Sequence, residues 1–62
     1  MRTIEKLFEA FHDSRYYYMH KDGRVGFAVN GTVQWYKYDG GSYVDVGITE
    51  HPQGAKLTKI KR

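Results

Sequence analysis

Turn signals divide most of this chain into short segments of alternating polarity. Breaks that contain glycine occur at residues 21–23, 29–31 and 39–42. The segments between these breaks alternate apolar and polar residues, which is the pattern of a strand with one buried face. We therefore predict four antiparallel strands, joined in sequence order as a meander, at residues 15–20, 24–29, 32–38 and 43–49.

The first residues follow a helical period instead of an alternating one. Four apolar residues recur at the spacing of a single helical stripe: Ile4, Leu7, Phe8 and Phe11. The sequence therefore predicts an amphipathic helix over residues 3–13, with Thr3 as its N-cap. The predicted fold class is α+β: one small domain over residues 1–62, in which the N-terminal helix packs on one face of the four-stranded meander.

The register of each hairpin follows from the length of its turn. We interpret residues 29–31 as a three-residue loop, which pairs Phe27 with Val33. A two-residue turn at 30–31 would instead place Phe27 opposite Gln34. We reject that alternative because it sets an apolar residue against a polar one across the sheet.

The other two turns pair Met19 with Val25, Tyr38 with Tyr43, and Trp35 with Val46. The three registers together predict an apolar face under the helix: Tyr17, Met19, Val25, Phe27, Val33, Trp35, Val44, Val46 and Ile48. Lys37 is the one charged residue on that face, and Asp45 falls on the other.

Five tyrosines are predicted to share the face that the helix leaves open: Tyr16, Tyr18, Tyr36, Tyr38 and Tyr43. Tyrosine combines a large rigid apolar area with a polar tip, which is typical of recognition surfaces. Arg24 falls on the same face and is predicted to orient a partner through its charge. These six residues are the predicted partner-binding site.

Basic charge is concentrated towards the C-terminal end. The whole chain has 10 Lys+Arg and 7 Asp+Glu, a formal net charge of +3. Four of the cations fall in residues 56–62: Lys56, Lys59, Lys61 and Arg62. We interpret them as a basic tail that accelerates encounter with an acidic or phosphate-bearing partner. The sequence leaves open whether residues 55–62 form a fifth edge strand, a short helix or a disordered tail.

Sequence signatures of catalysis are missing. The chain has no cysteine, which excludes disulfides and thiol chemistry. His12, His20 and His51 lie in three distant segments, which argues against a zinc site. No nucleotide-binding loop, zinc-protease motif or nucleophile elbow is present. We expect a non-enzymatic, cytoplasmic protein without cofactor or metal, and no apolar run approaches the length of a membrane span.

The expected function is binding. We predict a small inhibitor- or adaptor-like protein that engages a protein partner through the tyrosine face. Size alone suggests an analogy with small regulators from phages and other mobile elements. The alternative is a single-stranded nucleic-acid-binding protein, in which the tyrosines stack on bases and the basic tail contacts phosphates. A second copy of the chain is a further candidate partner.

Overall fold

A computed structural model describes residues 4–60 of the chain. It consists of one short helix, α1 (Ile4–Ala10), and a five-stranded antiparallel sheet. The strands are β1 (Tyr16–Met19), β2 (Val25–Val29), β3 (Thr32–Asp39), β4 (Ser42–Thr49) and β5 (Lys56–Lys59). The α+β class is therefore confirmed, with one strand more than the four predicted. The predicted N-cap at Thr3, and Lys61 and Arg62 of the predicted tail, lie outside the described residues.

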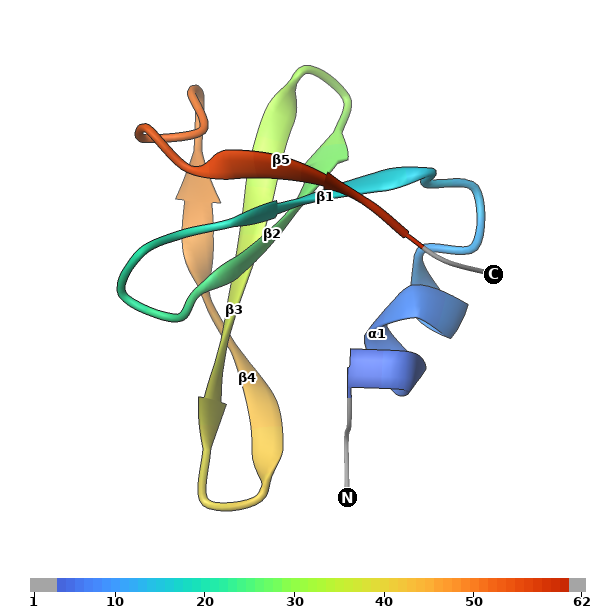
Figure 1. Cartoon of the computed structure of the whole chain (residues 1–62), viewed down its shortest axis with the longest axis vertical. Helices are drawn as coiled ribbons and strands as arrows, with labels where there is room; N and C mark the ends of the chain where they lie inside the picture. Colours follow the sequence, from blue (N-terminus) through green and yellow to red (C-terminus); the bar gives the residue numbers. More distant parts are fainter. Residues whose placement is uncertain (1–3, 61–62) are drawn as a thin grey trace.

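The strand order in the sheet is β4-β3-β2-β1-β5. The first four strands form the predicted meander, and β5 returns to pair antiparallel with β1, with Tyr16 opposite Lys59. Strands β1 and β5 cross the β3–β4 hairpin at a steep angle, as expected of a strongly twisted sheet (Figure 1). Residues 56–59 are thus a fifth edge strand, which settles the alternatives left open for that segment, and β4 is the other edge.

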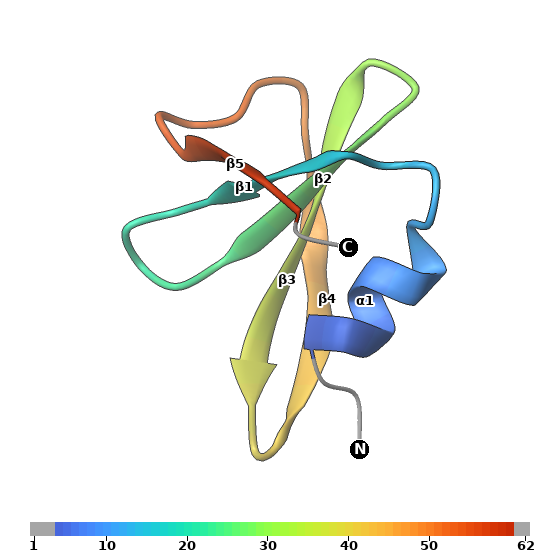
Figure 2. The same cartoon turned by 45° about the vertical axis from the view of Figure 1, so that its right-hand side comes forward.

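The apolar stripe of the helix is confirmed, although α1 ends at Ala10 instead of residue 13. Phe8 lies against Tyr17, with their ring centroids 5.5 Å apart. Phe11 stacks on Phe27 at a centroid distance of 4.4 Å. The helix stands to one side of the sheet (Figure 2), and these aromatic contacts join the two.

Within residues 4–60, a cluster of buried residues fills the space between helix and sheet. Its buried members are Leu7, Val25, Phe27 and Ile60, and its half-buried members are Ile4, Phe8, Phe11, Tyr17, Tyr36 and Tyr43. Ile60 follows β5, and its N–H donates to the carbonyl of Arg15 at 2.9 Å. The segment predicted as a basic tail therefore supplies part of the core.

The turn between β2 and β3 contradicts the prediction. Asn30 has φ 49° and Gly31 has φ 82°. Two successive residues with positive φ are the signature of a two-residue type I′ turn, which Asn-Gly favours strongly. Phe27 consequently lies opposite Gln34 and not opposite Val33. The predicted register is wrong because the local preference of Asn-Gly outweighs the apolar pairing.

This shift by one residue moves each side chain of β3 to the other face. Tyr36 lies on the helix side, with its ring centroid 5.9 Å from that of Phe11. Trp35 and Val33 lie on the opposite face, where Trp35 is directly opposite Gly26. The prediction that Trp35 and Val33 belong to the helix-covered face is therefore wrong. The sheet buries apolar residues on both faces.

The outer two registers are confirmed near their turns, since Met19 lies opposite Val25 and Tyr38 opposite Tyr43. Nearer the middle of β3 and β4, a bulge changes the pairing.

At this bulge Trp35 lies opposite Gly47, so the predicted pair of Trp35 with Val46 is wrong, and Val46 is the extra residue of β4. Gly47 has φ 123°, a conformation that favours glycine. Oδ1 of Asp45 accepts hydrogen bonds from the N–H of Gly47 at 2.9 Å and from the side-chain amide of Gln34 at 2.6 Å. The carboxylate of Asp45 therefore stabilises the bulge.

Candidate functional site: the sheet face opposite the helix

The structure does not assemble the predicted five-tyrosine face. Tyr36 and Tyr43 pack against the helix-side cluster. Tyr38 lies opposite Tyr43 with ring centroids 5.3 Å apart, so it belongs to the helix side of the sheet although it is exposed. Burial, reinforced by Tyr38, raises the pKa of Tyr43 above its ordinary value of 10.0. Of the five predicted tyrosines, Tyr16 and Tyr18 lie on the sheet face opposite α1.

We call the sheet face opposite α1 the Trp35 face. One row of directly opposed residues crosses all five strands on this face: Leu57, Tyr18, Gly26, Trp35 and Gly47. Trp35 is only 1% exposed although the helix lies on the other side. A Cβ at Gly26 would lie 2.8 Å from the indole ring. The missing side chain at Gly26 therefore makes room for the indole against the sheet.

Basic side chains flank this row. Lys37 follows Tyr36 in β3, so alternation places it on the Trp35 face instead of on the predicted helix side. Asp45 lies opposite Tyr36 and therefore belongs to the helix side, contrary to the prediction. On β5, Lys59 lies opposite Tyr16. The corrected register thus moves Lys37 onto the Trp35 face and Asp45 off it, and the pairing of β5 with β1 adds Lys59.

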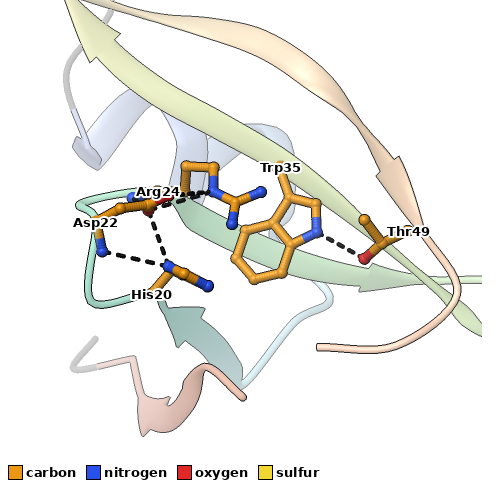
Figure 3. Close-up of polar contacts among 5 residues, drawn as sticks. All are labelled: His20, Asp22, Arg24, Trp35 and Thr49. Atoms are coloured by element: carbon orange, nitrogen blue, oxygen red, sulfur yellow. Dashed lines mark hydrogen bonds and ion pairs between the residues drawn. The ribbon is translucent and has the colours of Figure 1, made fainter. Parts of the chain in front are cut away.

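Arg24, a predicted site residue, is held in place by Asp22 (Figure 3). Nε of Arg24 donates to Oδ2 of Asp22 at 2.9 Å and to Oδ1 at 3.2 Å, and the backbone N–H of Arg24 donates to Oδ1 at 3.0 Å. The guanidinium carbon lies 5.0 Å from the centroid of the Trp35 ring. This arrangement combines a charged hydrogen bond with a cation–π contact.

Two further residues complete the surroundings of Trp35. The indole N–H donates to Oγ1 of Thr49 at 2.7 Å. His20 meets the ring edge-on at a centroid distance of 5.9 Å, and its Nδ1 lies 3.0 Å from Oδ1 of Asp22. Turn 20–24 and strands β3 and β4 therefore meet around one indole ring.

The pKa of Asp22 is lowered below its ordinary value of 3.8, first because the backbone N–H of Arg24 bonds the carboxylate and then because Arg24 and His20 lie nearby. A carboxyl group with a lower pKa in the folded state stabilises the fold above its unfolded pKa and loses that contribution as pH falls through the folded value. We expect acidification below about pH 3.8 to release Arg24 from Asp22 and to change the fluorescence of Trp35. A pH titration of the wild type and of Asp22→Asn tests this, since the variant should lack the transition; an identical transition in both proteins would contradict the assignment.

Sequence reasoning identified Arg24 and paired it with His20, and the backbone N–H of His20 does donate to the carbonyl of Arg24 at 2.9 Å. It missed the contacts of Arg24 with Asp22 and Trp35, and the bond of Trp35 to Thr49. A local signal for Asp22 was present, because an aspartate side chain commonly accepts from the N–H two residues later. The contacts to Trp35 and Thr49 depend on the register of β2, β3 and β4, which the pattern predicted incorrectly.

The described residues contain no cluster of three or more His, Asp or Glu side chains that could hold a metal ion. Within the same part of the chain, no helix is long and apolar enough to cross a membrane. Comparisons with protein-family models, with curated proteins and with solved structures found no significant match.

The two edges of the sheet differ in chemistry. β4 exposes three large aliphatic side chains: Val44 (41%), Val46 (47%) and Ile48 (63%). β5 carries Lys56 and Lys59 along a strand of four residues. Lysines on an edge strand oppose the addition of a further strand, whereas an aliphatic edge invites it. Of the two edge strands, β4 is thus the one that favours pairing with a further strand.

Proposed function

We propose that this chain is a small non-enzymatic protein-binding domain that engages its partner along β4. The observation that carries the proposal is the exposure of Val44, Val46 and Ile48 on an edge strand. Burying aliphatic surface is favourable by about 25 cal/mol per Å², and an edge strand also offers unpaired N–H and C=O groups.

The chemistry of β4 favours an extended segment of the partner, added as a further strand. Residues 42–49 contain no Lys, Arg or Pro, the residues that commonly block an edge. Their one charged side chain, Asp45, is bonded within the domain to Gln34 and Gly47. A domain that binds an extended segment of its partner, and catalyses no reaction, would act as an adaptor or an inhibitor.

A matched pair of substitutions tests this proposal. Val46→Lys places a charge on the proposed edge, and Leu57→Lys places one at a similarly exposed aliphatic residue on the opposite edge. We expect affinity capture from lysate, followed by mass spectrometry, to lose a discrete protein with Val46→Lys and to retain it with Leu57→Lys. Circular dichroism checks that both variants fold. Equal capture by both variants, or a loss confined to Leu57→Lys, would contradict the role of β4.

The chemistry of the Trp35 face supports single-stranded nucleic acid as a second candidate ligand. Arg24 and Lys37 share that face with Tyr18, and Lys59 lies opposite Tyr16. Tyrosines can stack on bases while the cations contact phosphates. This candidate predicts that oligonucleotide binding, measured by fluorescence anisotropy, falls steeply between about 50 and 200 mM salt and weakens in Tyr16→Ala. An absence of binding at low salt would remove it.

A further inference from the structure

The side chain of Arg24 is fixed from two directions. The carboxylate of Asp22 accepts hydrogen bonds from the Nε–H and from the backbone N–H of Arg24. This one carboxylate therefore fixes both the side chain and the backbone of Arg24. The guanidinium lies over Trp35 at 5.0 Å. The indole is buried and donates a hydrogen bond to Thr49, so its position is fixed. The guanidinium therefore packs on a rigid ring.

The fixed guanidinium still has donors to offer. Within residues 4–60, both terminal nitrogens, Nη1 and Nη2, lack a hydrogen-bond partner, since the bonds to Asp22 use Nε and the backbone N–H. Figure 3 shows these two nitrogens pointing away from Asp22. The side chain is 25% exposed, so the donors are partly removed from water while remaining accessible. Donors in this situation gain more from a partner than fully solvated ones.

The charges around Arg24 indicate which chemical class of ligand would accept hydrogen bonds from Nη1 and Nη2. The opposite charges of Asp22 and Arg24 offset each other, so the pair does not favour a highly charged ion. A planar group with two acceptor oxygens and a single negative charge fits the fork of Nη1 and Nη2 and has the least repulsion from Asp22. A carboxylate meets these conditions better than a phosphate dianion does.

We infer that the terminal nitrogens of Arg24, held over Trp35 by Asp22, form a binding site for a carboxylate group. The site lies directly before β2, whereas the proposed partner-binding residues belong to β4. It stands independently of the proposed partner strand, because it concerns a single functional group that a small probe can supply.

Sodium acetate is the first probe, titrated against sodium chloride at constant ionic strength and pH 7. The chain has a single tryptophan, so its fluorescence reports directly on Trp35, and the ¹⁵N–¹H signal of Arg24 Nε reports on the guanidinium. We expect saturable changes in both signals with acetate and no saturation with chloride. Inorganic phosphate at the same ionic strength should bind more weakly than acetate.

Two variants of Arg24 distinguish the contribution of its paired Nη1 and Nη2 donors from that of its positive charge. Arg24→Lys keeps the charge without the fork, and we expect about tenfold weaker acetate binding. Arg24→Gln, a second variant in case the first does not fold, should lose saturable binding altogether. Lys6→Gln removes an exposed cation from α1, on the other side of the sheet, and should bind acetate like the wild type. Equal acetate affinity in Arg24→Lys and wild type, or chloride behaving like acetate, would overturn the site; tighter binding of phosphate would overturn its assignment to carboxylates.

Discussion

Truncation of the chain after Ala55 is expected to unfold the domain. The truncation removes β5, which pairs with all four residues of β1, and it removes Ile60, which is 5% exposed in the helix-side cluster. Burial of one large aliphatic side chain contributes about 1.5–3 kcal/mol, and a core of this size rarely supplies more than about 3–5 kcal/mol in total. Far-UV circular dichroism and urea unfolding of the full and truncated chains measure the effect.

The control for this truncation retains β5 and changes only its charge. Lys56→Gln combined with Lys59→Gln preserves the strand and Ile60, so the double variant should unfold at nearly the same urea concentration as the wild type. A truncated chain with the unfolding midpoint of the wild type would show that residues 56–62 are a dispensable tail.

Replacement of Trp35 by alanine is expected to have an effect of similar size. The side chain is 1% exposed and contacts both Gly26 and Arg24. Truncation of a buried aromatic side chain costs about 3–5 kcal/mol, which approaches the whole stability expected of such a small domain. We expect Trp35→Ala to be largely unfolded at 25 °C, as measured by circular dichroism and by the loss of dispersion in the NMR spectrum.

Tyr38→Ala is the matched control, because it removes an aromatic side chain from the same strand that is 55% exposed. This control should remain folded. Similar urea midpoints for Trp35→Ala and Tyr38→Ala would contradict the burial of Trp35 on the face opposite the helix.

Local patterns were sufficient to predict α1, the first four strands and two of the turn registers. The helical stripe containing Leu7 and the glycine turns each express a preference within a few residues, so the sequence records them directly. Turn 30–31 was misread because two local signals disagreed there. Alternation favoured Phe27 opposite Val33, whereas Asn-Gly favoured the type I′ turn that the structure contains.

The remaining differences arise from contacts between distant segments. The alternation pattern cannot reveal that both faces of the sheet bury an aromatic residue, Phe27 on one side and Trp35 on the other. The bulge at Val46 is stabilised by the hydrogen bond of Asp45 with Gln34, which joins β4 to β3. β5 is a strand because β1 offers it an edge, and nothing local in residues 56–59 requires that conformation. The predicted tyrosine face failed because of the misread turn 30–31, which moves Tyr36 and Tyr38, and Tyr43 opposite Tyr38, to the helix side.

The pairing of β5 with β1 also has a consequence for the kinetics of folding. The hairpins β1–β2, β2–β3 and β3–β4 join neighbouring segments, whereas Tyr16 and Lys59 meet from positions about 40 residues apart. Closing a loop of that length carries an entropic cost that short hairpins avoid. We expect the arrival of β5 to be the late event in folding, so stopped-flow measurements should show Ile60→Val speeding unfolding while leaving the refolding rate nearly unchanged.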